Sequence, residues 1–155
     1  MSVAKQIAHK NRLKQFCQSL MEERIAAAKE AMAAAQEAAN AAEKSSAGDK
    51  YETARAMGHL EKDMHAKQLA SYIKELSALS AAPTGAVHTT IQNGVFIKTN
   101  QNNFFIAAGL GKQLIDGVAV YFLSAAAPLA LQLQGKTTGH RFLFNKEWLV
   151  VEEVY

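Results

Sequence analysis

The chain has 155 residues, of which 49% are hydrophobic and 20% are charged, and its formal net charge is +3. This composition excludes an intrinsically disordered chain and fits one ordinary domain or two small ones. A weak positive charge permits contact with nucleic acid or with an acidic protein surface, but requires neither.

A single long helix is predicted at the start of the chain. Residues 3–44 contain neither Pro nor Gly and are rich in good helix formers, and their apolar side chains recur at steps of four and three, the period of a coiled-coil seam. This seam consists of Met21, Ile25, Ala28, Met32, Ala35, Ala39 and Ala42, with the bulkier Leu13, Phe16 and Leu20 before it. At ~1.5 Å per residue the helix would be ~60 Å long. A helix of this length needs a partner to bury its seam.

The nearest partner is a second helix predicted over residues 49–79. Its expected apolar face consists of Ala54, Met57, Leu60, Met64, Leu69, Ile73, Leu76 and Leu79. Gly58 costs a helix about 1 kcal/mol relative to Ala, so its presence suggests close packing. Because the connection at residues 45–48 is short, we expect residues 1–80 to form an antiparallel coiled coil with its tip near residues 45–52. The alternative is homodimerisation through the seam, and we expect a monomer.

A linker and a small domain follow. Pro83 and Gly85 make residues 81–85 a linker, and residues 86–155 are richer in β-branched and aromatic residues. Strands are predicted at 95–99, 104–108, 114–115, 118–123, 141–144 and 149–154. Asp116-Gly117 is a hairpin signal, and a short helix should begin at Pro128 and stop at Gly135. The predicted class is α+β, and the aromatic residues of the strands are interpreted as core.

Cysteine use and hydropathy bear on the compartment. Cys17 is alone, so no intrachain disulfide forms, and we expect it to be buried in the first helix. The polar, basic residues 1–12 do not resemble a secretory signal. The most apolar segment, 118–133, is shorter than the roughly 20 residues of a membrane span. These features predict a cytoplasmic protein without a membrane association.

Two carboxylates lie at the expected tip. Asp49 and Glu52 are three residues apart, so both project from one side of the first turn of the second helix. One interpretation is a capping pattern, which also suits the positive end of the helix dipole. The other is a partial metal site, because Mg²⁺ prefers six oxygen ligands and a partner protein would have to supply the rest.

The tip segment resembles a motif of a known family. It reads Gly48-Asp49-Lys50-Tyr51-Glu52-Thr53-Ala54. This is similar to the Gly-Asp-x-x-Glu-Asn-Ala segment of the bacterial Gre transcript-cleavage factors. Residues 124–139, with Pro128 and Gly135-Lys136, resemble a second segment of that family, Ser-x-x-Ser-Pro followed by Gly-Lys-x-x-Gly-Asp. The order of hairpin, linker and small domain is also the same.

The resemblance implies a fold and a function. The C-terminal domain would be FKBP-like and would dock on bacterial RNA polymerase, through a region that includes Pro128, Gly135 and Lys136. The coiled coil would enter the secondary channel. Asp49 and Glu52 would help to hold Mg²⁺ at the polymerase active centre and stimulate cleavage of backtracked RNA. The chain would not itself be an enzyme, and it would meet the nascent RNA 3′ end only indirectly.

Neighbouring residues leave alternatives open. Lys50, Tyr51 and Arg55 flank the carboxylates and are candidates for contact with RNA or the polymerase, or else belong to an ordinary solvated helix face. The sequence departs from the family pattern at Thr53, Arg55, Ala127 and His140. These departures motivate a second hypothesis, a non-catalytic factor that enters the same channel and modulates the polymerase. A third is a plain coiled-coil interaction module in which the two acids are caps.

Overall fold

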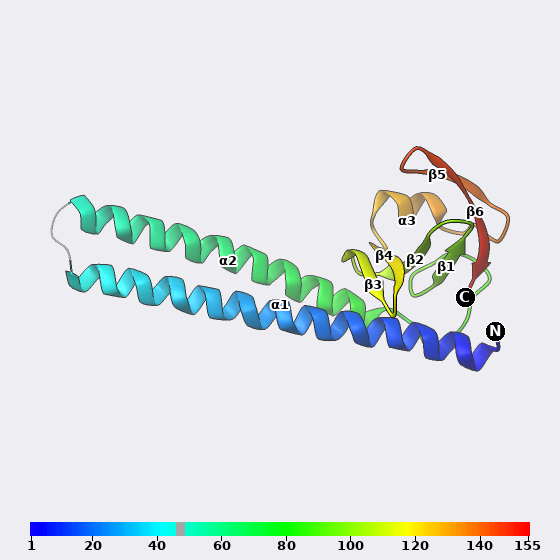
Figure 1. The fold of residues 1–155 in the computed structure, drawn as a ribbon, viewed down its shortest axis with the longest axis horizontal. Coiled ribbons are helices and arrows are strands. Elements are labelled where there is room, and N and C mark those ends of the chain that lie inside the picture. Colours follow the sequence, from blue (N-terminus) through cyan, green and yellow to red (C-terminus); the bar gives the residue numbers. More distant parts are fainter. Residues whose placement is uncertain (46–48) are drawn as a thin grey trace. The chain divides into compact units, whose positions relative to one another are not determined.

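The computed structural model describes the backbone of residues 1–45 and 49–155, and the side chains of residues 1–41 and 52–155. Contacts divide the chain into two compact units. Unit 2 is Ser19–Lys74, and unit 1 joins Met1–Gln18 to Glu75–Tyr155. Two long helices, α1 (Val3–Ser45) and α2 (Asp49–Ala81), precede a six-stranded sheet with one short helix (Figure 1). The predicted α+β class, with an N-terminal helical hairpin, is confirmed.

Unit 2 is an antiparallel pair of helices with small residues at its contact. Met21, Ala28 and Ala35 of the predicted α1 seam are buried. A Cβ placed on Gly58 would lie 2.8 Å from the Cβ of Ala39, so the two backbones approach too closely there for any larger residue. The prediction that Gly58 marks close packing is therefore confirmed.

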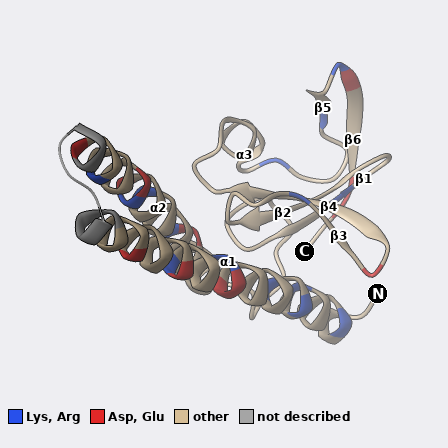
Figure 2. Cartoon of the chain, turned by 60° about the vertical axis from the view of Figure 1, so that its left-hand side comes forward, with Lys and Arg blue, Asp and Glu red and all other residues tan. Residues whose placement is uncertain are grey.

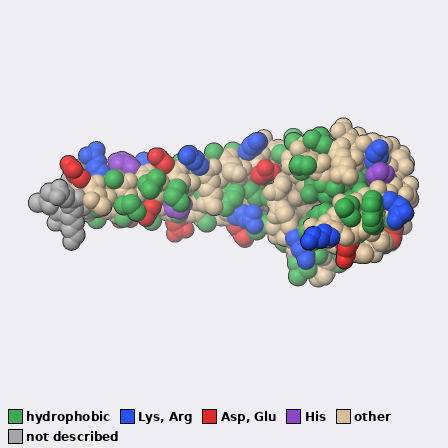
Figure 3. All heavy atoms as spheres, turned by 90° about the horizontal axis from the view of Figure 1, so that it is seen from above, with side chains coloured by type: hydrophobic (Ala, Val, Ile, Leu, Met, Phe, Trp, Pro, Cys, Tyr) green, Lys and Arg blue, Asp and Glu red, His purple; other side chains and the backbone are tan. Residues whose placement is uncertain are grey.

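The buried face of α2 differs from the predicted one. Met57, Leu60 and Met64 are more than half exposed, and Figure 3 shows exposed hydrophobic side chains interleaved with charged ones along the hairpin. The residue that meets α1 is Gly58, beside Met57. The prediction assigned the largest apolar side chains to the seam. It was wrong for Met57, Leu60 and Met64 because the backbones near Gly58 lie too close together for a large side chain between them. Leu79, from the same predicted face, is buried as expected.

The sheet of unit 1 has the strand order β3-β4-β2-β1-β6-β5. Only β2 and β4 pair in parallel, and every other neighbouring pair is antiparallel. The strands are β1 (Phe96–Thr99), β2 (Asn103–Ala107), β3 (Gly111–Ile115), β4 (Val118–Ser124), β5 (Arg141–Phe144) and β6 (Glu147–Val154). The short helix α3 (Pro128–Leu133) lies between β4 and β5 in the chain. All six predicted strands and the predicted helix are present.

Two hairpins have turns of the kind their sequences favour. Asp116 and Gly117 both have positive φ, 52° and 78°, which is the backbone of a type I′ turn. Asn145 and Lys146 have the same signature, with φ of 50° and 66°. The Asp-Gly prediction is confirmed, and the β5–β6 turn follows the same rule with Asn first.

One face of the sheet packs with α3 around a core of buried apolar side chains. This core contains Ile91, Val95, Ile97, Phe104, Ile106, Ala130, Leu133, Phe142, Leu149 and Val151. Phe104 contacts the rings of Tyr121, Phe142 and Phe144. The interpretation of the strand aromatics as core is therefore confirmed for Phe104 and Phe142, but it is wrong for Trp148 of β6, which is 59% exposed.

The other face carries a row of aromatic rings that crosses four chain segments. Phe122, Phe105 and Phe96 are register partners on β4, β2 and β1. Tyr155 continues the row, because its backbone exchanges two hydrogen bonds with Phe96. The first turns of α1 cover this end of the row, where the His9 ring packs edge-on against Phe96 at 4.7 Å.

Lysines of α1 hold the segment that follows α2. The last turn of α2 has no basic residue, so its carbonyl groups need donors from elsewhere. Lys14 Nζ donates to the carbonyls of Ser80 and Ala82, each at 3.1 Å, and Lys10 Nζ donates to that of Ala86 at 2.6 Å. Lys10 is fully buried, and burial lowers the pKa of its ammonium group. These bonds fix the exit of α2 against α1 within unit 1.

Candidate functional site

The predicted tip falls partly outside the described residues. Residues 46–48 lie outside them, and so do the side chains of Asp49, Lys50 and Tyr51. The backbone places Asp49 as the first residue of α2. Asp49 and Glu52 therefore share the first turn of this helix, as the sequence predicts.

The first turns of α2 present charge to solvent. Glu52 and Arg55 are both exposed, three residues apart on the helix. The N-terminus of a helix carries a partial positive charge from its unpaired N–H groups, which stabilises an ionised carboxylate in the first turn. The exposed Glu52 carboxylate therefore lies at the end of the helix that attracts negative charge.

The first turn of α2 offers too few carboxylate oxygens to bind a metal ion by itself. Two carboxylates can fill only part of the six-oxygen shell that Mg²⁺ prefers. Among the residues whose placement is described, no group of three or more His, Cys, Asp or Glu side chains could hold a metal ion. A metal bound here would take its remaining ligands from water and a second molecule.

The three predicted docking residues lie at the two ends of α3. Pro128 is its first residue, and Gly135 and Lys136 follow its last turn. All three are exposed. Gly135 has a φ of 78°, and its N–H donates to Ile91, whose own N–H donates to Lys136. This reciprocal pair fixes the backbone after α3 and leaves the Lys136 side chain in solvent.

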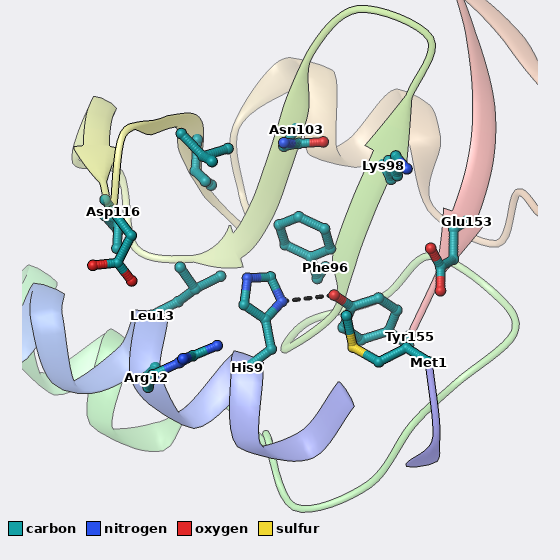
Figure 4. Close-up of a pocket in the computed structure, with 13 residues that line it drawn as sticks. Met1, His9, Arg12, Leu13, Phe96, Lys98, Asn103, Asp116, Glu153 and Tyr155 are labelled. Atoms are coloured by element: carbon teal, nitrogen blue, oxygen red, sulfur yellow. Dashed lines mark hydrogen bonds between the residues drawn. The ribbon is translucent and has the colours of Figure 1, made fainter. Parts of the chain in front are cut away.

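A second site was not singled out by sequence reasoning. A cavity of about 320 Å³ lies in unit 1, between the first turns of α1 and the aromatic face of the sheet (Figure 4). His9 Nδ1 lies 2.6 Å from the hydroxyl oxygen of Tyr155 at its edge. The only signal in the sequence is a set of basic residues in α1 before the first acid, which Figure 2 shows as Lys and Arg along its first turns. Nothing in that pattern indicates which strands they meet.

Comparisons with known proteins add no assignment. Neither family models, nor curated proteins, nor solved structures gave a match to this chain. Within the described parts of the chain, neither long helix is apolar enough to cross a membrane.

Proposed function

We propose that this chain is a Gre-like factor that enters the secondary channel of a bacterial RNA polymerase and stimulates cleavage of backtracked RNA. Asp49 and Glu52 would donate oxygens to a Mg²⁺ ion that the polymerase also holds. The observation that carries the proposal is their shared place in the first turn of α2, which only three residues separate from the end of α1. The polymerase would carry out the chemistry, so the chain alone would not be an enzyme.

The helical hairpin supports this role through its width. Contact through Ala and Gly brings α1 and α2 close together, since a Cβ added at Gly58 would lie only 2.8 Å from the Cβ of Ala39. A pair of closely packed helices can enter a narrower opening than a pair separated by large side chains. The six-stranded domain would be the FKBP-like part that docks outside the channel, with Pro128, Gly135 and Lys136 in the contact.

A cleavage assay tests the proposal. Defined backtracked complexes are mixed with the wild-type chain, with Asp49→Ala/Glu52→Ala, or with Glu61→Ala, an exposed carboxylate elsewhere on α2. Release of the RNA 3′ fragment is followed over a Mg²⁺ titration. We expect the double variant to lose about 100-fold or more of the stimulation, since even the loss of an outer-shell partner of a metal costs 10–100-fold.

Two outcomes would overturn the cleavage function. One is no stimulation by the wild-type chain over polymerase alone. The other is equal stimulation by the wild-type and double-alanine chains. Glu61→Ala should behave as wild type, which separates a local effect at the first turn from a general loss of negative charge on the helix.

Arg55 favours a second candidate function. Its exposed guanidinium lies one turn after Glu52, close enough to compete with a metal ion for that carboxylate. A factor of this kind would occupy the channel and modulate initiation without cleavage. Tight polymerase binding without cleavage, unchanged in Asp49→Ala/Glu52→Ala, would favour this function. Failure to bind polymerase at all would instead favour the third hypothesis, a plain coiled-coil interaction module.

A further inference from the structure

Strand β5 leaves one edge of the sheet open. It is the terminal strand beside β6, and in Figures 1 and 2 no described element of unit 1 lies beyond it. A sheet edge presents unpaired N–H and C=O groups that can pair with another chain, and native edges are usually blunted by proline, a bulge or a covering helix. β5 reads Arg-Phe-Leu-Phe without proline, and its pairing with β6 is regular over all four residues.

The hydrogen bonds of β6 show which residues of β5 face outward. The Val150 N–H donates to the side-chain oxygen of Asn100 at 2.9 Å, and its carbonyl accepts from the Asn100 N–H at 3.3 Å. Val150 therefore directs these groups away from its register partner Arg141. Bonded and non-bonded pairs alternate in an antiparallel ladder, so Leu143 also occupies a non-bonded position. The N–H and C=O groups of Arg141 and Leu143 point away from β6, and no described residue bonds to them.

An exposed apolar pair lies beside this edge. Leu143 and Trp148 are register partners on β5 and β6, and they are 50% and 59% exposed. They alternate along their strands with Phe142 and Leu149, which are buried in the core that contains α3. The pair is therefore on the opposite face of the sheet from α3 and distinct from the predicted docking region there.

The charge beside the edge is positive. The Arg141 guanidinium lies 5.6 Å from the centroid of the Trp148 ring, and no described carboxylate pairs with it. β5 contains no acidic residue, and the nearest in the chain, Glu147, is the register partner of Phe144 and so lies on the opposite face from Arg141. A strand that paired with β5 would meet Leu143 and Arg141 as its neighbours on this face.

A second copy of the chain fits this edge poorly. β5 is four residues long, whereas a stable protein–protein interface takes about 20–30 residues from each side. Two β5 edges would also bring together two cations and no acid. A short extended peptide meets neither obstacle, because main-chain hydrogen bonds provide its affinity and a few side chains its specificity.

We propose that β5 binds an extended acidic segment of a partner protein as an additional antiparallel strand. The partner residue opposite Leu143 would be apolar, and the residue two positions after it, opposite Arg141, would be Asp or Glu. Opposite charges placed across a strand pair stabilise it, and like charges destabilise it. The site uses neither the helical hairpin nor α3, so its test does not depend on the cleavage function.

Three peptides test the edge and its charge preference. The reference is acetyl-Ser-Thr-Val-Thr-Glu-Thr-Ser-amide, the second carries Lys in place of Glu, and the third carries N-methyl-Val. Each is titrated into the ¹⁵N-labelled full chain. We expect the reference peptide to shift the amide signals of Arg141 and Leu143 and the indole signal of Trp148. The Lys peptide should bind about fivefold more weakly, and the N-methyl peptide, which lacks one main-chain donor, about tenfold more weakly.

Exposed variants of the chain test the two side chains of the edge. Arg141→Glu should reverse the charge preference, so that the Lys peptide binds more tightly than the reference peptide. Leu143→Thr should weaken binding of the reference peptide about threefold or more, since it removes apolar area. Leu114→Thr is the matched control and should bind as wild type does, because Leu114 is 67% exposed on β3, at the other end of the sheet.

Several results would overturn the proposal. Equal affinity for the Glu and Lys peptides, or a preference that Arg141→Glu leaves unchanged, would exclude the acidic partner. Undiminished binding of the N-methyl peptide would exclude strand pairing. Signals that shift only on β3, or no shift at millimolar peptide, would exclude the site. A dimer of the free chain that Leu143→Thr dissociates in sedimentation experiments would identify a second copy as the occupant in place of the peptide.

Discussion

His9 is kept as a neutral imidazole by its surroundings. Burial lowers the pKa of its ring, and the nearby Arg12 guanidinium lowers it further, while Glu153 acts in the opposite direction. In the unfolded chain the ring regains the ordinary pKa of about 6.5. Below that pH the unfolded state binds a proton that the folded state resists, so the free energy of unfolding falls as the pH falls.

A glutamine at this position should remove that pH dependence. For the wild-type chain we expect the urea midpoint to fall between pH 7.5 and pH 5, and for His9→Gln we expect a smaller fall over the same range. Urea unfolding followed by tryptophan fluorescence measures both. His59→Gln, on the exposed surface of α2, is the control and should keep the wild-type slope. Parallel pH curves for wild type and His9→Gln would contradict this explanation.

At the level of single residues, the burial of Lys10 could not be predicted from the sequence. A lysine is almost never fully buried unless it is paired, so no local pattern predicts that Lys10 lies inside. The structure buries it because the carbonyl of Ala86, 76 residues away, accepts its hydrogen bond. By contrast, the burial of Cys17 was predicted correctly, since free Cys is among the most frequently buried residue types.

At the scale of elements, helices and strands were predictable because local rules determine them. The first helix was expected over 3–44 and spans Val3–Ser45, and the short helix at Pro128 begins at that proline. The exposed side of α2 was not predictable in the same way. Which of two apolar stripes faces α1 depends on how closely the helices approach, and that distance is set by Ala39 and Gly58 together.

The contact at Gly58 predicts an unusual mutational result. Gly→Ala in a helix normally stabilises it by about 1 kcal/mol, but here the new methyl group would meet Ala39 Cβ at 2.8 Å. We expect Gly58→Ala to show no gain in thermal stability, and Gly58→Val to cost about 1–3 kcal/mol as overpacking does. Circular dichroism melts measure both.

A compensating change provides the control for that contact. Ala39→Gly in the Gly58→Ala background returns the missing space to the other helix, so it should recover part of the packing loss. Gln68→Ala changes an exposed residue of α2, so its effect on thermal stability should be the same with Ala or Gly at position 39. A full 1 kcal/mol gain from Gly58→Ala alone would contradict the close approach of the two backbones.

At the scale of the whole molecule, the chain leaves unit 1 and returns to it. Residues 1–18 and 75–155 form one compact unit, and residues 19–74 form the other. The sequence indicated a hairpin followed by a small domain, because helical periodicity continues without a break through residue 18. Which part of a continuous helix packs on a distant sheet depends on contacts such as Gln6 with Glu153, and no local pattern encodes them.

This division predicts that unit 2 can be excised. A chain in which a short Gly/Ser linker replaces residues 19–74 should fold cooperatively, because both parts of unit 1 are kept. Residues 75–155 alone should instead bind a dye such as anilinonaphthalene sulfonate, since the Phe96 and Phe105 face would lose the helix that covers it. The two proteins are compared by ¹⁵N spectra and dye fluorescence. A well-dispersed spectrum from residues 75–155 alone would contradict the role of residues 1–18.

The hydrogen bond between His9 and Tyr155 joins residues 146 positions apart, and it has a consequence for synthesis on the ribosome. Residues 19–74 are contiguous, so the hairpin can pair its helices while the strands are still being made. The first turns of α1 leave the ribosome before every strand of the sheet but find that sheet only after β6 has emerged. Until then Leu13 and Cys17, buried in the finished protein, are exposed to solvent or to a chaperone. A segment synthesised before every strand of the sheet is thus among the last to reach its native contacts.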